Sequence, residues 1–490
     1  MLIVSVKIGI MLATATMPSL FVDWPQEMRL SVLELLPLAD LLALSRVNKQ
    51  FHIFTEPVLY AKVALTWLMD KAPPLSLLLR TLLNSPQLGH HVRSLRLDGH
   101  RFSKKARRID TVPPPLSVDD LVVSKASQFI RSTRVPQAQL WQDELQSDRN
   151  LDAIVALLLS MMPNLTSLHL GPAFTIDSRF LGIVLRCALC EPRDRYCLPT
   201  FEHLRRVTFS RRAHEEWHPK AANNASDVLP FFYLTGIQSL SVSIDTPLEF
   251  SWPAPASPAP SSLTRLDLGR LRETRLATVL SALNGLQKLH WNWYYEPDLD
   301  RNVSEDVVEV DTMAEALGLV GDSLTDLTID AETLPDLSDG GYEEPEVQIR
   351  GSLLDGGLAR LGKLRRLCVP WAFLMGLSPS TARKLEGVLP PSLEVLNLTI
   401  DLLSAPVEEW YWEEDSIISE VKSWFENPTG SLLMLGKLRC IILPLYVNDV
   451  TEEMVTELRQ LGAHAGARLE YADAWVGTDK FRRYCLAIRS

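Results

Sequence analysis

The chain has 490 residues, of which 46% are hydrophobic and 22% are charged, and its formal net charge at pH 7 is −11. This composition excludes a disordered chain and provides the apolar mass of a packed core. The negative charge disfavours nucleic acid as the main partner, and six cysteines are too few for a disulfide scaffold. We therefore expect a globular protein of a reducing compartment, cytoplasmic or nuclear.

Residues 1–16 are a doubtful leader. The apolar run from Leu2 to Ala15 is shorter than the roughly 20 residues that cross a bilayer. Lys7 interrupts it and no basic residue precedes it, unlike a secretory signal. Our hypothesis is that translation starts at Met17. No other segment has the length and apolarity of a membrane span, so we expect no membrane partner.

Three helices are predicted between Leu20 and Trp67. Pro25 suits the first position of a helix, where a missing N–H costs nothing, and apolar residues then recur at helical spacing until Pro37. Fewer than about 50 residues bury only a marginal core, and the surplus of Leu, Val and Phe would stay exposed without a partner. The segment is predicted to be a docking module, although helical spacing alone also fits a subdomain that caps the following region.

The order of residues in this segment favours the docking module, because it resembles the F-box signature. The matching positions are Trp24-Pro25-Gln26-Glu27-Met28, Val32-Leu33, Leu36-Pro37, Asp40-Leu41, Leu44, Val47-Asn48-Lys49 and Phe51. Pro57-Val58-Leu59-Tyr60 is similar to an extension common in F-box proteins of filamentous fungi. Trp24 departs from the family, which usually has leucine there.

The resemblance implies that an F-box over residues 17–68 inserts into the adaptor subunit of an SCF-type cullin–RING ubiquitin ligase. By this resemblance, eight positions form the module's core and its adaptor-binding surface. One sequence cannot tell which of them belong to the core and which to the surface. These adaptor-binding candidates are Trp24, Pro25, Val32, Leu33, Leu36, Leu41, Val47 and Phe51.

A short apolar pattern, apolar-x-x-apolar-x-apolar, recurs after a turn from about residue 90 onward. Its ten copies are Val92-Leu95-Leu97, Leu165-Leu168-Leu170, Leu204-Val207-Phe209, Ile237-Leu240-Val242, Leu263-Leu266-Leu268, Leu286-Leu289-Trp291, Leu324-Leu327-Ile329, Leu364-Leu367-Val369, Leu393-Leu396-Leu398 and Leu438-Ile441-Leu443. The last two apolar residues of each copy are two apart, as in a strand with one buried face. Helix-like stretches lie between copies, at Asp152–Met162, Glu273–Leu283, Thr312–Val320, Ala382–Leu389 and Glu452–Leu461. A strand and a helix cannot bury their apolar faces alone, but stacked copies can.

The pattern resembles an irregular leucine-rich-repeat array. Its copies start 23 to 73 residues apart, less evenly than the roughly 20–29 of that class, and the family's asparagine after the last leucine is missing. We expect an α/β fold: the N-terminal three-helix F-box, a helical linker over residues 69–89, and an irregular solenoid over 90–490 with loop insertions. Its parallel strands would line the concave side and its helices the outside.

Residues that alternate with the buried pair of each strand point to the opposite, concave face. In the central copies they are polar and of mixed charge, as expected of a protein-binding surface. These target-binding candidates are Arg265, Asp267, Lys288, His290, Asn292, Asp326, Thr328, Asp330, Arg366 and Asn397. Each one alone would be explained by solvation of a curved sheet, so the hypothesis rests on the set.

Few residues suggest other chemistry. Cys187, Cys190, Cys197 and His203 have a spacing that could ligate zinc, but Cys187 and Cys190 follow an apolar helical run, which favours buried or incidental thiols. No phosphate-binding glycine loop, nucleophile elbow or metalloprotease motif is present. We expect no catalytic residue, no metal and no cofactor.

Two further patterns have two interpretations each. The basic run over residues 101–108 fits a solvated loop better than a nuclear-import patch. Trp291 holds a core position, and we expect Trp293, Tyr294 and Tyr295 to leave the strand and to be exposed as partner anchors.

Together these expectations describe a non-enzymatic substrate-recognition subunit, with the adaptor and the cullin as partners at one end and an unknown target protein on the repeats. The alternatives are a scaffold of the same architecture that acts outside a ligase, and a secreted leucine-rich-repeat binding protein.

Overall fold

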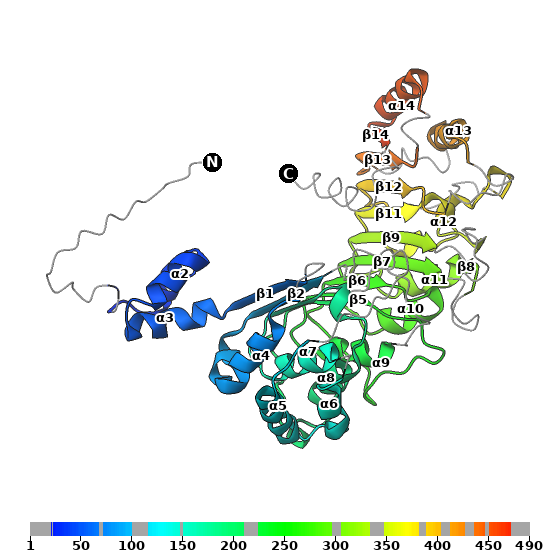
Figure 1. Cartoon of the computed structure of the whole chain (residues 1–490). Helices are drawn as coiled ribbons and strands as arrows, with labels where there is room; N and C mark the ends of the chain where they lie inside the picture. Colours follow the sequence, from blue (N-terminus) through cyan, green and yellow to red (C-terminus); the bar gives the residue numbers. More distant parts are fainter. Residues whose placement is uncertain are drawn as a thin grey trace. The chain divides into compact units, whose positions relative to one another are not determined.

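The computed structural model describes residues 21, 23–67, 72–99, 116–147, 150–209, 224–295, 305–333, 347–381, 389–402, 412–426, 436–445 and 450–471 (Figure 1). The chain divides into two units, residues 1–62 and 63–490. The doubtful leader and the basic run over 101–108 lie outside the described residues.

The first unit consists of three helices, as predicted. They are α1 (Gln26–Leu33), α2 (Leu38–Ser45) and α3 (Lys49–Leu59). Pro37 precedes α2, and the Asn48 side chain caps α3 by accepting a hydrogen bond from the backbone N–H of Phe51 at 2.8 Å. Leu33 and Leu41 are buried, at 0% and 5% exposed, and form the centre of this small core.

The second unit is built on a twelve-stranded sheet whose strands follow chain order. They are β1 (Lys62–Trp67), β2 (Ser94–Gly99), β3 (Ser167–Leu170), β4 (Arg206–Phe209), β5 (Ser239–Ser243), β6 (Arg265–Gly269), β7 (Lys288–Tyr295), β9 (Asp326–Thr333), β11 (Arg366–Pro370), β12 (Val395–Thr399), β13 (Cys440–Leu443) and β14 (Arg468–Tyr471). Neighbouring strands from β2 to β14 are parallel. β8 (Val307–Glu309) and β10 (Gln348–Arg350) form a separate parallel pair.

Helices occupy the connections between strands, as parallel pairing requires. They are α4 (Leu75–Asn84), α5 (Asp120–Thr133), α6 (Ala138–Glu144), α7 (Leu151–Ser160), α8 (Arg179–Leu189), α9 (Ala225–Val228), α10 (Glu273–Leu280), α11 (Val310–Gly318), α12 (Trp371–Met375), α13 (Glu414–Glu426) and α14 (Glu452–Ala465). Four of the five predicted helical stretches correspond to α7, α10, α11 and α14; most of Ala382–Leu389 lies outside the described residues.

The boundary between the units differs from our expectation. Residues 63–67 belong to the strand β1 of the second unit's sheet rather than to the helical module. The expected linker contains α4, whose Leu75, Leu79 and Leu82 are fully buried and which packs beside α5 and α7. The segment after the first unit is therefore part of the second unit's core.

All ten copies of the apolar pattern lie on neighbouring strands, β2 to β13. Each of their thirty side chains is at most 7% exposed, so the first apolar residue of each copy, in the turn before the strand, is buried with the other two. This confirms the alternation predicted from sequence. The pattern did not identify β1 and β14, which complete the sheet at its two ends.

A repeated hydrogen bond joins the starts of these strands. The backbone carbonyl of Thr166 accepts from the N–H groups of both Arg205 and Arg206, at 2.9 and 3.2 Å. Nine carbonyls from β2 to β12, including that of Thr166, accept two hydrogen bonds in this way. We call the ten positions that this ladder joins the edge row: Arg93, Thr166, Arg205, Gln238, Thr264, Gln287, Thr325, Arg365, Glu394 and Arg439. The ladder fixes the register of every copy, although the copies are unevenly spaced in sequence.

Candidate functional site

The structure separates the eight adaptor-binding candidates into core and surface. Leu33 and Leu41 are buried within the three-helix unit, and Leu36 and Phe51 are half-buried. Phe51 packs on Phe21, with ring centroids 6.0 Å apart. The exposed candidates are Trp24, Pro25, Val32 and Val47.

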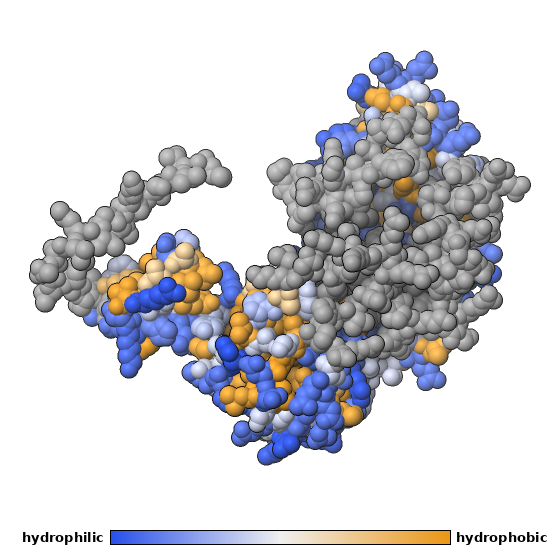
Figure 2. Space-filling view, in the orientation of Figure 1, coloured by the Kyte–Doolittle hydropathy of each residue, from blue (hydrophilic) through white to orange (hydrophobic). Residues whose placement is uncertain are grey.

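Large apolar side chains are concentrated on the surface of this small unit. Eight of the thirteen exposed large apolar side chains of the described chain belong to it. We call this set the N-terminal apolar surface: Trp24 (37% exposed), Met28 (55%), Val32 (37%), Leu35 (84%), Leu38 (63%), Leu42 (41%), Val47 (63%) and Ile53 (57%). Apolar atoms gather on the face of the unit shown in Figure 2. The other five exposed side chains are spread over the much longer second unit.

The spacing of these residues explains why so much apolar area is exposed. Met28 and Val32 are one turn apart on α1, and Leu38 and Leu42 are one turn apart on α2, so each pair lies along one helix face. These faces are additional to the ones that bury Leu33 and Leu41. A unit of this size cannot bury two apolar faces per helix by itself, which is the property of a surface that a partner covers.

The second candidate surface is the polar face of the sheet, formed by residues that alternate with the buried rows. Strand pairing aligns Arg265, Lys288, Asp326 and Arg366 as one row, and Asp267, His290 and Thr328 as the next. Asn292 pairs with Asp330 in a third row. The structure therefore brings nine of the ten target-binding candidates together on β6, β7, β9 and β11.

His290 contacts two carboxylates of this face. Its Nδ1 lies 3.1 Å from Oδ1 of Asp267 and its Nε2 lies 2.6 Å from Oδ2 of Asp330. Burial lowers the pKa of His290, but the hydrogen bonds to Asp267 and Asp330 outweigh it, so the pKa is raised from 6.5 to about 10. The ring is therefore an imidazolium at neutral pH and joins three neighbouring strands.

A second ion cluster lies in the adjacent row. Oδ1 of Asp326 is 3.5 Å from Nζ of Lys288 and 3.4 Å from the Arg366 guanidinium. Two cations thus share one carboxylate, and this part of the face keeps a positive charge.

Asp401, which follows β12, is a member of the polar face that the sequence did not indicate. Its Oδ2 accepts a hydrogen bond from the backbone N–H of Ala331 on β9 at 3.1 Å. Burial and then the nearby carboxylate of Asp330 raise the pKa of Asp401 to about 7. The contact joins residues 70 positions apart, so no local pattern could have revealed it.

Asn397 is the target-binding candidate that the structure removes from the surface. It is 3% exposed, and its amide donates to the Sγ of Cys368 at 3.2 Å. Strand pairing places it in the polar row as predicted, beside Cys368, but its burial leaves no surface for a target.

The expectation that Trp293, Tyr294 and Tyr295 are exposed was wrong. β7 continues to Tyr295, and the three side chains are 0%, 3% and 9% exposed. The indole N–H of Trp293 donates to Oε2 of the buried Glu273 at 2.8 Å, and the Arg272 guanidinium lies over its ring, 4.6 Å from the centroid. These aromatic residues therefore stabilise the core and are not partner anchors.

The cysteines of the suggested zinc pattern have different environments: Cys187 is buried, Cys190 is half-buried and Cys197 is exposed. Burial raises the pKa of Cys187, and it raises that of Cys190 to about 12, which opposes formation of the thiolate that zinc requires. In the described part of the chain, no three His, Cys, Asp or Glu side chains are grouped so that they could hold a metal ion.

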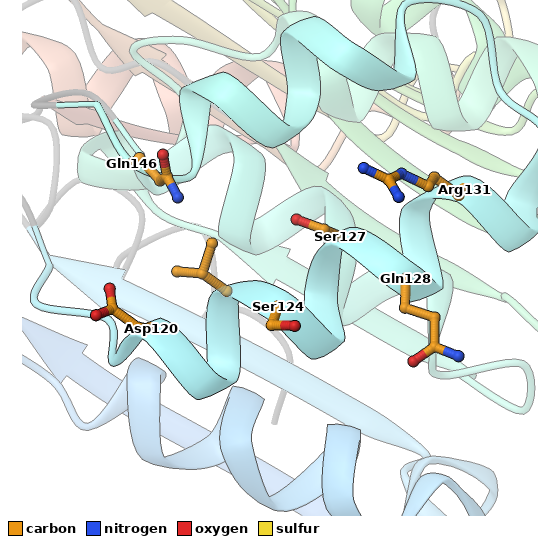
Figure 3. A pocket seen from close by; sticks show the side chains of 7 residues that line it. Asp120, Ser124, Ser127, Gln128, Arg131 and Gln146 are labelled. Carbon is orange, nitrogen blue, oxygen red and sulfur yellow. The ribbon is translucent and has the colours of Figure 1, made fainter.

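A shallow hollow of about 660 Å³ lies along α5 (Figure 3). Asp120, Val123, Ser124, Ser127, Gln128, Arg131 and Gln146 line it. Asp120 and Arg131 are at its opposite ends (Figure 3), so its charged groups do not converge on one point. The arrangement does not favour acid–base or nucleophilic chemistry there.

None of the helices described here combines the length and apolarity needed to cross a membrane. Neither a scan against protein-family models nor a search of curated proteins finds a match for this sequence.

Proposed function

We propose that this chain is the substrate-recognition subunit of an SCF-type cullin–RING ubiquitin ligase. The N-terminal unit would act as an F-box that binds the adaptor subunit, and the polar face of the sheet, as a leucine-rich-repeat surface, would hold a target protein. The observation that carries this proposal is the N-terminal apolar surface, which lies on the same three-helix unit as the F-box order of residues.

The energetics of the surface support a protein partner. Fully burying a Leu, Val or Met side chain contributes about 1.5–3 kcal/mol relative to leaving it exposed. The eight large apolar side chains of this three-helix unit could supply a stable interface after the cost of association is subtracted. Leu35 and Leu38, at 84% and 63% exposed, have the most area to lose.

In this proposal the chain contributes proximity and no chemistry. The adaptor end would attach it to the cullin, and the polar face would raise the effective concentration of target lysines near a ubiquitin-charged enzyme. No catalytic residue, metal or cofactor has a part in it. The compartment would be the cytoplasm or the nucleus, where cullin ligases act.

The test is recovery of partners from cells with surface variants. Leu35→Asp combined with Val47→Asp changes exposed positions, whereas changing the buried Leu41 would test folding instead. The matched control is Leu248→Asp combined with Leu319→Asp, at leucines of the second unit that are 57% and 53% exposed.

The proposal expects the adaptor and the cullin to be recovered with the wild-type chain and the control, but not with the Leu35→Asp, Val47→Asp chain. Recovery of the adaptor without a cullin would support a scaffold outside a ligase. A glycosylated chain without either partner would support the secreted alternative.

A further inference from the structure

Basic residues are concentrated where the strands of the sheet begin. Beside the edge row lies the first residue of each strand from β2 to β14: Ser94, Ser167, Arg206, Ser239, Arg265, Lys288, Asp326, Arg366, Val395, Cys440 and Arg468. Across both rows there are nine basic side chains and two carboxylates, Asp326 and Glu394. We call the nine the basic band: Arg93, Arg205, Arg206, Arg265, Lys288, Arg365, Arg366, Arg439 and Arg468.

This concentration is unusual for the chain. Lys and Arg make up 49 of 490 residues, so about two would be expected among the twenty-one positions of the two rows, and nine are found. Carboxylates outnumber them in the whole chain, 60 to 49. The band is thus a positive strip on a negatively charged protein, and it follows the strand starts, which are far apart in sequence.

Much of the band is available to a partner. Arg93, Arg206, Arg265 and Arg439 are exposed and make no ion pair with any residue that the structure describes. Lys288 and Arg366 share the single carboxylate of Asp326. Strand pairing places Arg206, Arg265, Lys288 and Arg366 at the same level of the sheet, so their charges lie along one line.

Carboxylates also lie near the other ends of the same strands, but cations accompany most of them. Asp98 on β2 lies 2.7 Å from Arg96, Asp245 after β5 lies 3.0 Å from Arg270, and Asp330 on β9 lies 2.6 Å from His290. At the strand starts, in contrast, basic side chains outnumber carboxylates nine to two. An anionic ligand is therefore favoured at the strand starts rather than over the whole polar face.

We propose that the basic band binds an extended, Asp- and Glu-rich segment of a target protein, lying across the strands. Strands about 4.8 Å apart give a band about 48 Å long from β2 to β14, which an extended segment of about 14 residues would span. This proposal rests on the proposed function in assigning the segment to a target, and it names the chemistry of that target.

An acidic polypeptide fits the band better than a nucleic acid does. A phosphate chain carries a charge at every nucleotide, whereas an acidic segment also contains uncharged residues, so the net charge of −11 repels the phosphate chain more strongly. The two rows contain no aromatic residue, although base stacking on aromatic side chains is the usual means of holding single strands.

The test measures fluorescence anisotropy of a labelled peptide of about 14 residues in which Glu alternates with Ser, titrated with the full chain. The variant is Arg206→Glu combined with Arg265→Glu. The control, Arg131→Glu combined with Arg459→Glu, makes the same change in net charge at exposed arginines of α5 and α14, outside the band.

We expect wild-type and control chains to bind the peptide with an affinity that falls as salt is added, and the variant to bind at least about tenfold more weakly, equivalent to about 1.4 kcal/mol. Equal affinities of variant and control would overturn the proposal, as would tighter binding of a single-stranded RNA of similar length. Adaptor binding by the same variant should be unchanged. A chain that binds the peptide but not the adaptor would contradict the proposed function alone.

Discussion

Nε2 of His290 lies 2.6 Å from Oδ2 of Asp330 on the neighbouring strand. Together with Asp267 on the other side, this contact makes a charged bridge across β6, β7 and β9. We predict that His290→Gln lowers the free energy of unfolding by about 2 kcal/mol at pH 6, because charge-assisted hydrogen bonds are lost. Urea unfolding of the two chains measures the difference.

We also predict that the loss of stability in His290→Gln depends on pH. The pKa of His290 is raised from 6.5 to about 10 by folding, so its stabilising effect is complete below pH 6.5 and is lost as the pH rises through about 10. The difference between wild type and His290→Gln should therefore shrink between pH 7 and pH 10. A difference that stays constant over this range would contradict an imidazolium bridge.

Asp152 on α7 gives a pH-dependent prediction of the same sign in a lower pH range. Its carboxylate accepts hydrogen bonds from the backbone N–H groups of Phe180 and Leu181 at the start of α8, at 2.7 and 3.2 Å. Burial raises its pKa from 3.8 to about 7 in spite of these bonds. Between pH 4 and pH 7 the folded chain holds a proton that the unfolded chain releases, so this group lowers stability as the pH rises.

Asp152→Asn removes that titration. The variant should gain stability relative to wild type as the pH increases from 5 to 8, by on the order of 2 kcal/mol. Denaturation midpoints at both pH values measure the gain. Parallel pH profiles of the two chains would show that the buried carboxylate does not titrate in this range.

The buried indoles of β7 offer a matched pair of variants. Trp293 donates to the carboxylate of Glu273 at 2.8 Å, and Trp291 donates to the neutral carbonyl of Leu271 at 2.9 Å. Trp293→Phe leaves a buried charge with one donor fewer, so it should cost about 1–3 kcal/mol and more than Trp291→Phe. Thermal unfolding of both variants tests the order, and a larger loss for Trp291→Phe would contradict it.

The strands could be predicted because the apolar residues of each copy of the pattern are the ones that the strand buries. In Leu263-Leu266-Leu268, for example, all three side chains are at most 2% exposed. β1 and β14 do not contain this pattern of buried apolar residues. Each has a neighbouring strand on one side only, and of the β1 side chains only Trp67 is buried, so the alternation of apolar residues there is too weak to identify a strand.

The residues of the polar face could be predicted from the sequence, but the contacts among them could not. Alternation along the strands placed His290 and Asp330 on one face, but their contact depends on which strands are neighbours. Asp401 reaches Ala331 across 70 residues, and Trp293 reaches Glu273 across 20. Both contacts depend on tertiary packing, so a pattern within one copy could reveal neither.

The residues of the proposed adaptor-binding surface could not be separated from the core by sequence alone. The F-box resemblance gave one set of residues for core and surface together, and burial divided them: Leu33 and Leu41 support the unit, whereas Val47 is 63% exposed. Leu35 and Leu38 are more exposed than most of the predicted positions. Variants at these exposed positions therefore separate docking from folding.

The most direct test of the central claim is calorimetric titration of the purified chain with a purified SCF-type adaptor subunit. Wild type and the Leu248→Asp, Leu319→Asp control should bind with the same affinity, and Leu35→Asp combined with Val47→Asp should bind about 100-fold more weakly, since each side chain is expected to contribute about 1.4 kcal/mol or more. Circular dichroism should show the same helix content in all three chains. A wild-type chain that does not bind the adaptor, or a Leu35→Asp, Val47→Asp chain that binds it as tightly as the control, would contradict the account.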